Sequence, residues 1–292
     1  MKLLLLGAAG QVGLELRGPL AVLGTVIAPT RAALDLGDLD ALRALVREHS
    51  PDVIVNCAAY NAVDDAEGDF DGALRINREA VAVLGEEAKA RKIALVTYST
   101  DYVFDASPSG GAAREGDPAN PLNAYGRSKL EGERALLALD APALIFRTAW
   151  VWSVGARGFV STMLRLARER EILRVVDDQV GNPTFARDLA FATATILHAF
   201  RRDPHGAVNE ARGVYHLAGA THASRYALAV AAIERDPKRN EHLVRVIEPI
   251  PSSAMTTAAR RPGWVVLDCQ KATERFGVTL PGYLDALGRA LV

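Results

Sequence analysis

A glycine-rich turn follows the first apolar segment of the chain. Lys2–Leu6 has the composition of a buried strand, and it continues into Gly7, Ala8, Ala9, Gly10, Gln11, Val12 and Gly13 before a helical periodicity begins. The first glycine of such a turn permits a tight bend, and the second lets backbone N–H groups approach a pyrophosphate at the helix N-terminus. The third lets helix and strand pack closely. The alternative is a plain turn, which the position after an apolar strand disfavours. The pattern predicts a dinucleotide-binding unit.

Strand-like and helix-like segments alternate over the first 150 residues. Such alternation is typical of a parallel sheet that helices cover on both faces. The expected strands are Lys2–Leu6, Thr25–Ala28, Asp52–Asn56, Ile93–Tyr98 and Ala143–Phe146, and the expected helices are Gln11–Leu20, Asp38–His49, Ala73–Ala90 and Leu122–Leu139. We therefore predict an α/β fold, a Rossmann-type doubly wound parallel sheet, with residues 1–150 as a dinucleotide-binding domain.

The alternation weakens after about residue 150. We expect helices at Gly155–Arg170 and Phe185–Phe200, and short strands at Val175–Val176, Val214–Leu217 and Val244–Ile247. Proline also becomes more frequent in this part of the chain. We therefore predict that residues 151–292 form a smaller substrate-binding lobe, partly interleaved with the first domain, with some segments returning to the sheet.

Charge and composition exclude several classes of partner. The formal net charge of −1 offers no basic footprint for nucleic acid or for an anionic membrane. No apolar stretch approaches the roughly 18 to 20 residues of a membrane-spanning helix. The apolar run at the N-terminus is too short for the apolar region of a signal peptide and has no small-residue cleavage site, so we expect none. The two cysteines, Cys57 and Cys269, lack metal-ligand spacing. A reducing cytoplasm is the expected compartment.

The end of the second expected strand bears on cofactor choice. An acid at this position usually bonds the adenosine ribose of NAD, but the segment from Ala28 to Arg31 has none. The Arg31 guanidinium is suited to bidentate pairing with a 2′-phosphate, which favours NADPH, while acceptance of NADH stays open. The alternative is a solvated surface arginine. We place Asp35 near the adenine, and the small Ala58 and Ala59 where nucleotide passes close to the backbone.

Three hydroxyl and amine side chains predict carbonyl chemistry. Tyr125 and Lys129 are spaced Y-x-x-x-K inside a helical segment, so they share one helix face. A tyrosine pKa near 10 is high for proton exchange at neutral pH, and a neighbouring ammonium is expected to lower it. Thr100 ends the fourth strand, where it is placed to orient a carbonyl oxygen; the alternative is a hydrogen-bonded strand-end hydroxyl. The set predicts that Tyr125 donates a proton, Lys129 tunes it, and the cofactor delivers hydride.

With these motifs the chain resembles the dTDP-4-dehydrorhamnose reductase family of extended short-chain dehydrogenase/reductases. The resemblance covers nearly the whole chain and is carried by the glycine loop and by five further segments, Asn56 to Glu67 (NCAAYNAVDDAE), Tyr98 to Phe104 (YSTDYVF), Pro121 to Lys129 (PLNAYGRSK), Phe146 to Trp152 (FRTAWVW) and Asp178 to Thr184 (DQVGNPT). It implies NADPH-dependent reduction of the C4 keto group of dTDP-4-dehydro-6-deoxy-L-mannose to dTDP-L-rhamnose.

The resemblance also assigns residues to the two ligands. It implies a cofactor site that contains Gly10, Gln11, Val12, Arg31, Asp35, Leu36, Ala58, Ala59, Tyr60, Tyr98, Tyr125 and Lys129. It implies that the sugar nucleotide meets Thr100, Asp101 and Trp150. Other readings stay open: Trp150 as core, Asp101 as the cap of a turn, and Asp178 with Gln179 as a turn rather than a wall of the site.

Two departures from the family pattern affect the expectations. Some members hold magnesium between subunits with acidic residues; Glu15 is present here, but Arg187 stands where a second acid is needed, and a cation opposes divalent metal binding. We therefore expect no metal and a monomer or a weak homodimer. Val265 replaces the serine of the Arg-Pro-x-x-Ser pattern that begins at Arg261, so a contact on the sugar-nucleotide side is in question.

Two further functions compete with the reductase. One is a non-catalytic regulatory protein that binds a sugar nucleotide or dinucleotide, against which the intact Thr100, Tyr125 and Lys129 argue. The other is a related sugar-nucleotide reductase or epimerase. An epimerase would retain NAD, and Arg31 argues modestly against it.

Overall fold

The computed structural model describes residues 1–107, 111–155 and 158–291. A six-stranded sheet lies at its centre in the order β10-β5-β4-β3-β1-β2, and every neighbouring pair is parallel. The strands are β1 (Lys2–Leu6), β2 (Thr25–Ile27), β3 (Val53–Asn56), β4 (Ala94–Thr100), β5 (Ala143–Thr148) and β10 (Gly213–His216). The strand order reverses beside β1, because β2 and β3 lie on opposite sides of it. Ligands bind at such a switch point, outside the carboxyl ends of the strands.

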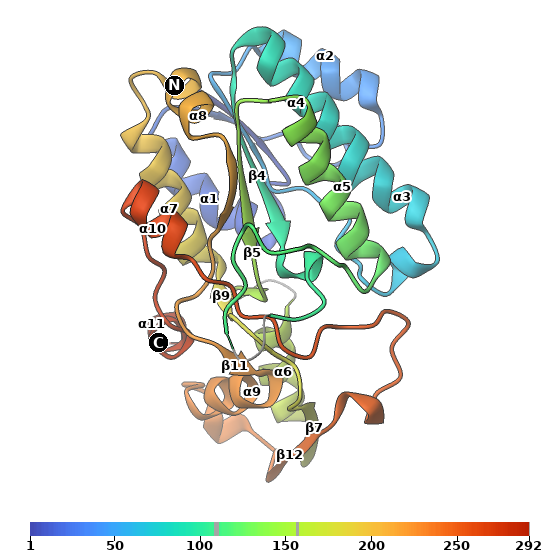
Figure 1. Ribbon diagram of the computed structural model, residues 1–292. Helices are drawn as coiled ribbons and strands as arrows, with labels where there is room; N and C mark the ends of the chain where they lie inside the picture. Colours follow the sequence, from blue (N-terminus) through green and yellow to red (C-terminus); the bar gives the residue numbers. More distant parts are fainter. Residues whose placement is uncertain (108–110, 156–157, 292) are drawn as a thin grey trace.

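Helices cover both faces of the sheet (Figure 1). One face packs against α1 (Gln11–Ala21), α7 (Ala186–Ala199), α8 (Pro204–Ala211) and α10 (Gln270–Phe276), and the other against α2 (Leu39–His49), α4 (Ala80–Arg91) and α5 (Ala124–Ala138). The leucines of β1 alternate between these two cores: Leu3 and Leu5 face the first, Leu4 and Leu6 the second. A strand buried on both faces must be apolar throughout, and this explains the run of leucines.

The predicted elements of the first 150 residues are confirmed with small shifts in their ends. Asp38 caps α2 as expected, accepting a hydrogen bond from the Ala41 N–H at 3.0 Å. The helix expected at Ala73–Ala90 is longer and interrupted. It consists of α3 (Phe70–Leu74), a π-helical turn η2 (Arg75–Glu79) and α4 in continuous succession. Such π turns arise frequently at functional sites.

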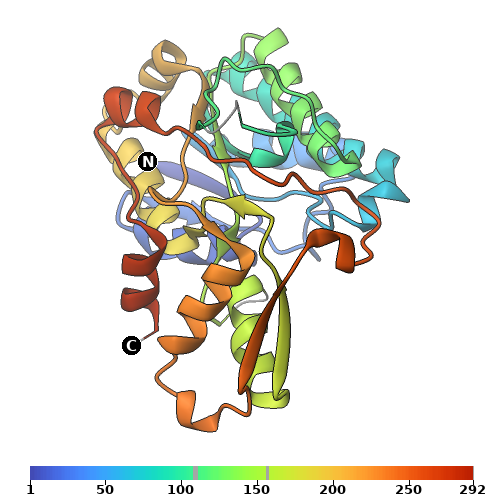
Figure 2. The same cartoon turned by 60° about the horizontal axis from the view of Figure 1, so that its bottom comes forward.

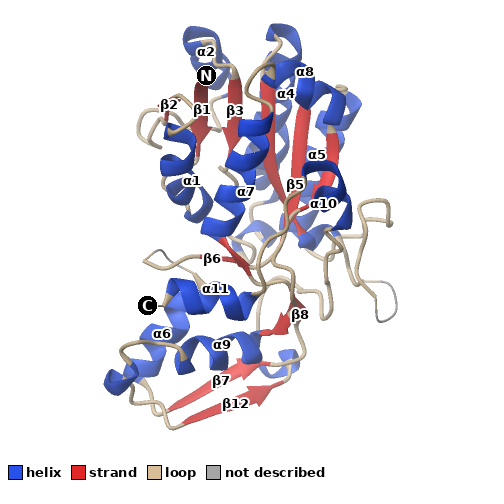
Figure 3. Cartoon of the chain, turned by 90° about the vertical axis from the view of Figure 1, so that its left-hand side faces the viewer, coloured by secondary structure: helices blue, strands red, loops and turns tan. Residues whose placement is uncertain are grey.

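A smaller lobe lies below the carboxyl ends of the sheet strands (Figures 1 and 3). Its helices are α6 (Phe159–Glu169), α9 (Arg225–Glu234) and α11 (Tyr283–Ala290), and its strand pairs are β7 (Ile172–Val176) with β12 (Val246–Ile250), β8 (Val180–Gly181) with β11 (Ala223–Ser224), and β6 (Val151–Trp152) with β9 (Thr184–Phe185). The expected helix Gly155–Arg170 begins at Phe159; residues 156 and 157 lie outside the described residues.

The chain crosses between the two parts several times. After the lobe strand β9, α7 and α8 return to one face of the sheet, and β10 pairs with β5 at its edge. The chain then forms α9 in the lobe. Short 3-10 turns η1 (Asp65–Glu67), η3 (Asp101–Val103), η4 (Arg239–Glu241) and η5 (Ser252–Ala254) lie in the connections. The segment from η5 to α10 runs across the molecule from the lobe back to the sheet (Figure 2). Residues far apart in sequence therefore meet where the parts join.

Candidate active site

The glycine loop forms a close backbone crossing at the end of β1. Gly7 has a φ of 74°, and a Cβ there would lie 2.6 Å from the Ala58 N atom, so only glycine fits. Gly10 precedes α1 with extended backbone and offers no side-chain cap to the helix N-terminus. The first N–H groups of α1 are thus available to an anion. The Gln11 side chain accepts a hydrogen bond from Ser153 Oγ at 3.1 Å, while Val12 packs on the first core.

The segment after β2 leaves one cation exposed. Arg31 lies in the turn after β2 and has no ion-pair partner within 4 Å among the described residues. Asp35, also exposed, accepts from its own turn at Gly37 N at 2.9 Å, and Leu36 packs partly on the second core. An exposed guanidinium that follows the strand paired with β1 is compatible with binding a phosphate.

A buried asparagine links the segment after β3 to α5, the helix that carries Tyr125. Asn77, 1% exposed in the π turn, accepts from Tyr60 N at 2.9 Å and donates to the Tyr60 carbonyl at 3.0 Å. Its amide also donates to Ser128 Oγ at 2.9 Å. Asn77 thereby holds the Ala58, Ala59 and Tyr60 segment at a set distance from α5. Sequence analysis missed this residue; the available signal was a polar side chain within an otherwise apolar helix stripe.

Lys129 points from α5 to the end of β4. Its Nζ donates to the Tyr98 carbonyl at 2.7 Å, and the residue is 6% exposed. Burial lowers the pKa of Lys129 to about 8, while Glu133 one turn later acts in the opposite direction. The Tyr98 ring itself belongs to the core, where its hydroxyl meets Thr193 Oγ1 at 2.7 Å. Tyr98 thus meets Lys129 through its backbone rather than its ring.

Tyr125 and Thr100 come together as predicted from their positions in the sheet and helix. Their hydroxyls lie within hydrogen-bonding reach, and Thr100 Oγ1 also contacts Asp101 Oδ1 at 3.1 Å. Burial raises the pKa of Tyr125 above its usual value, with Thr100 acting in the opposite direction. The sequence predicts that Lys129 lowers the pKa of Tyr125; in this structure burial dominates and the net pKa is raised, while Lys129 is engaged by the Tyr98 carbonyl. Tyr125 is protonated at neutral pH.

The N-terminus of α5 is anchored on three sides. Asn123 caps it by accepting from Gly126 N at 2.8 Å, and the same side chain donates to the Arg260 carbonyl at 2.8 Å. Glu67 accepts from Ala124 N at 2.7 Å. A Cβ on Gly126 would lie 2.2 Å from the Tyr102 carbonyl oxygen, so this glycine lets α5 approach the segment after β4. These contacts hold Tyr125 against Thr100.

Aromatic and charged groups from four segments gather beside Tyr125. The Tyr102 ring meets the Tyr125 ring edge-on at 5.9 Å between centroids. Arg225, the first residue of α9, stacks with its Cζ 3.6 Å from the centroid of a Trp150 ring. Arg261, on the crossing segment, pairs with Asp64 at 2.7 Å. Trp150 has a φ of 44°, a conformation that costs a non-glycine residue roughly 1–3 kcal/mol and is concentrated at ligand sites.

Asp101 belongs to this cluster as a buried carboxyl group. It is 3% exposed, and burial raises its pKa to about 7, with Thr100 and then Arg225 acting in the opposite direction. Its carbonyl also accepts from Phe104 N in the turn η3. Asp101 therefore closes a turn and also contacts the pair of hydroxyls formed by Thr100 and Tyr125, here called the hydroxyl pair, through Thr100.

The remaining expected residues contact groups other than Tyr125. Asp178 is occupied by Ser252, accepting from its N–H at 2.9 Å, and Gln179 donates to Ser252 Oγ at 2.9 Å. Val265, where the family pattern has serine, is 2% exposed in an apolar cluster with Val103. The valine side chain therefore serves packing.

The position expected to oppose metal binding forms an ion pair. Arg187 Nε donates to Glu15 Oε2 at 2.8 Å, and Arg289 pairs with the neighbouring Asp188 at 2.6 Å. These contacts link α1, α7 and α11. Glu15 is thus neutralised by a cation from its own chain.

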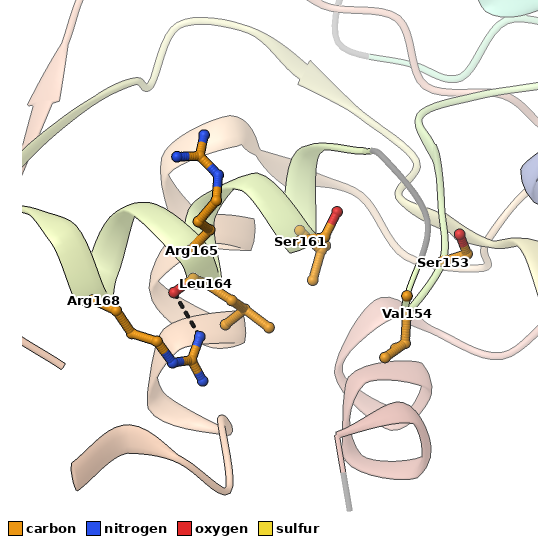
Figure 4. Close-up of a pocket in the computed structure, with 8 residues that line it drawn as sticks. Ser153, Val154, Ser161, Leu164, Arg165 and Arg168 are labelled. Carbon is orange, nitrogen blue, oxygen red and sulfur yellow. Dashed lines mark hydrogen bonds between the residues drawn. The ribbon is translucent and has the colours of Figure 1, made fainter. Parts of the chain in front are cut away.

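A separate cavity of about 270 Å³ lies along α6 (Figure 4). Ser153, Leu164, Arg165 and Arg168 line it, and Arg168 donates to the Leu164 carbonyl at 2.7 Å. Its described lining does not include the hydroxyl pair or Lys129. Across residues 1–107, 111–155 and 158–291, no helix is both long and apolar enough to cross a membrane.

Comparison with known proteins places the chain in a family. The model of the RmlD substrate binding domain family matches residues 1–292. A dTDP-4-dehydrorhamnose reductase from Burkholderia thailandensis is 45% identical over 292 residues, covering 99% of this chain and 97% of that protein. The chain belongs to the dTDP-4-dehydrorhamnose reductase family.

Solved structures of family members have the same fold. The dTDP-4-dehydrorhamnose reductase of Clostridium acetobutylicum superposes with a TM-score of 0.88 at 32% identity, covering 99% of this chain and 98% of that one. The Bacillus anthracis enzyme, solved in complex with NADP, also has a TM-score of 0.88, at 28% identity and the same coverage. The Rossmann-type fold predicted from sequence is therefore confirmed.

Proposed function

We propose that this protein reduces the C4 keto group of dTDP-4-dehydro-6-deoxy-L-mannose to dTDP-L-rhamnose with NADPH. The observation that carries the proposal is the meeting of the Tyr125 and Thr100 hydroxyls beside Lys129, at the carboxyl end of β4. This arrangement occurs in a family whose members are named dTDP-4-dehydrorhamnose reductases. The same geometry argues against a purely regulatory protein, which needs no proton donor.

The chain's own residues fit the cofactor. The Gly7 crossing excludes any Cβ, the N-terminus of α1 has no side-chain cap, and the exposed Arg31 has no ion-pair partner among the described residues. We assign the diphosphate to the Gly7–Gly13 loop, the 2′-phosphate to Arg31, and the adenine side to Asp35 and Leu36. Ala58, Ala59 and Tyr60 border the nucleotide, and Lys129 holds the nicotinamide ribose.

Tyr125 performs the proton transfer, and Thr100 positions the group that accepts the proton. NADPH, when bound, has the chemistry to donate a hydride to the keto carbon. The Tyr125 hydroxyl, protonated at neutral pH, donates its proton to the keto oxygen, and Thr100 orients that oxygen. The Lys129 ammonium beside the Tyr98 carbonyl stabilises the tyrosinate that this transfer leaves. Asp101 and Trp150 bind the sugar nucleotide at the same strand ends.

The deciding experiment follows NADPH oxidation by absorbance with dTDP-4-keto-L-rhamnose as substrate. Turnover that yields dTDP-L-rhamnose supports the proposal. Binding of the sugar nucleotide without turnover supports the regulatory alternative. Interconversion of sugar nucleotides with no net cofactor oxidation supports an epimerase. The proposal fails in either of the last two cases.

We further propose that the protein acts in the cytoplasm as a monomer or a weak homodimer that needs no metal. Free Cys57 and Cys269 suit a reducing compartment. The Glu15–Arg187 pair leaves that carboxylate without need of a bridging cation. Sedimentation at micromolar concentration, with and without magnesium, tests the assembly; a metal-dependent dimer contradicts it.

A further inference from the structure

Two guanidinium groups meet at one phenol in the site. Arg225 and Arg261 each lie within hydrogen-bonding reach of the Tyr102 hydroxyl, although α9 carries the first and the crossing segment the second. Tyr102 follows β4, and its ring touches that of Tyr125. The three side chains therefore belong to three separate segments and converge next to the proton donor.

The charges in this cluster are not balanced. Arg261 is paired with Asp64 at 2.7 Å, but Arg225 has no salt bridge within 4 Å to any described carboxylate. Asp101 attracts it only through charge, and burial leaves that carboxyl only partly ionised at neutral pH, since its pKa is raised to about 7. Burial also lowers the pKa of Arg225, and Arg261 adds repulsion. Arg225 is half-buried and stacked between aromatic rings without a carboxylate partner among the described residues, so a bound anion would supply the negative charge that this cluster lacks.

The orientation of Arg225 is set before any ligand arrives. Its guanidinium lies 3.6 Å from a Trp150 ring centroid and 5.2 Å from the ring of Phe159. Because the faces of the planar guanidinium stack on aromatic rings, its N–H groups, which lie along the edge of the plane as a fork, are the part that can bind a polar ligand. A planar fork of this kind suits two phosphate oxygens at once.

We propose that Arg225, with Arg261, binds the diphosphate of the sugar nucleotide and is the specificity-determining cation that the smaller lobe contributes. This inference rests on the proposed function. The keto group at C4 must reach Tyr125, and the diphosphate leaves the opposite side of the sugar at C1. Tyr102 lies between the two, in contact with Tyr125 at one end and with both guanidiniums at its hydroxyl. One sugar ring would thus separate the proton donor from the anion site.

The test measures binding of dTDP and of thymidine to the full chain by calorimetry, at saturating NADP. We expect Arg225→Gln to weaken dTDP binding about 10- to 100-fold, as loss of a charge-assisted pair implies, and to leave thymidine binding unchanged. Arg225→Lys, which keeps the charge but loses the planar fork, is expected to lose less. Arg235→Gln is the matched control, because Arg235 directly follows the same helix, is exposed, and among the described residues donates only to the Ala231 carbonyl.

Each outcome decides a different claim. Equal dTDP affinity in wild type and Arg225→Gln overturns the role of Arg225 while leaving the reductase proposal intact. Equal weakening of dTDP and thymidine also overturns it, since that result indicates loss of site structure. If wild type binds neither compound, the sugar-nucleotide function itself fails. Should Arg225→Gln not fold, the ratio of dTDP to thymidine affinity in Arg225→Lys provides the same comparison.

Discussion

The proposed active site has a cofactor end and a substrate end, as assigned above, and the two are constructed differently. The cofactor end is made mainly of backbone: the Gly7 crossing, the start of α1, and the Tyr98 carbonyl that receives Lys129. The substrate end is made of side chains, with Tyr102, Trp150, Arg225 and Arg261 drawn from distant segments. Parallel strand register places the first set automatically, whereas the second exists only once the lobe has packed against the sheet.

This difference implies separate consequences of substitution. At the cofactor end, we expect a substitution to reduce activity when it adds a Cβ to a glycine such as Gly7 or removes a cationic side chain. At the substrate end, a single side chain alters recognition without altering the sheet. The following predictions test that separation, from the largest expected effect to the smallest.

Lys129→Met is expected to have the largest effect. The change removes both roles proposed for Lys129, stabilisation of the tyrosinate and contact with the ribose. The value of kcat should therefore fall by at least the roughly 10²- to 10⁴-fold of general acid catalysis, and NADPH affinity should weaken. In wild type, kcat/KM should decline as pH rises through about 8, where the Lys129 cation loses its proton. Steady-state pH profiles and NADPH titration check both points. Undiminished NADPH affinity in the variant would contradict the ribose contact.

Tyr125→Phe should lower kcat by about 10²- to 10⁴-fold while leaving NADPH affinity nearly unchanged, because the ring still packs on Tyr102. Thr100→Val should cost less, since Thr100 orients without transferring a proton. Tyr226→Phe, on the lobe, is a matched control and should be neutral. Single-turnover rates measure the chemical step directly. Wild-type turnover in Tyr125→Phe would exclude this residue as the proton donor.

Arg31→Ala should remove most of a preference for NADPH over NADH. The lost charge-assisted contact is worth roughly 1.5–3 kcal/mol, equivalent to about a 10- to 100-fold change in the ratio of kcat/KM values. The NADH value itself should hardly change. Kinetics with both cofactors on wild type and variant measure the ratio. Equal use of both by wild type, unaffected by the substitution, would rule out the assignment.

Glu87→Gln tests the scaffold without touching the site. Glu87 of α4 is 3% exposed and is held by Arg47, Arg91 and Arg43, which lower its pKa to about 2. Since these arginines are partly exposed, we expect a loss of about 1–3 kcal/mol at pH 7. A lowered carboxyl pKa stabilises the fold above the unfolded value near 4.5 and loses its effect as pH falls toward 2.

Urea unfolding at pH 7 and at pH 3 should therefore show a difference between wild type and Glu87→Gln that narrows in acid. Turnover at pH 7 should be the same for both proteins. A constant stability difference across that range would show that packing rather than charge is responsible.

Chelation should have the smallest effect. Arg187 already neutralises Glu15 at 2.8 Å, so activity should survive EDTA and gain little from magnesium. Arg187→Glu restores an acid at this position and serves as the comparison. A large loss on chelation of wild type, reversed by magnesium, would show that the ion pair opens to accept metal.

Several parts of the structure were accessible from sequence for local reasons. The β1 leucines and the glycine loop follow from burial on two faces and from the lack of room for a Cβ. The meeting of Thr100 and Tyr125 follows from strand-end placement and helical spacing. By contrast, the π turn around Asn77 was missed, because a single asparagine does not reveal that its amide will bridge Tyr60 and Ser128.

The pKa of Tyr125 illustrates the same limit. Helical spacing puts Lys129 one turn away, from which a lowered pKa was expected. Whether the pKa of Tyr125 is raised or lowered depends on burial and on the group that Lys129 hydrogen-bonds, and the spacing of the two residues reveals neither.

The sequence by itself determined the parallel sheet, the glycine loop, and the helix that carries Tyr125 and Lys129, because each depends on contacts within or between neighbouring strands and helices. Only the tertiary structure decided how the charges are arranged. Arg187 forms an ion pair with Glu15, Asp178 accepts a hydrogen bond from Ser252, and Arg225 stacks on Trp150. The members of each pair lie far apart along the chain. A side chain's partner depends on which surfaces are buried against each other, and that is settled when the lobe docks beneath the sheet.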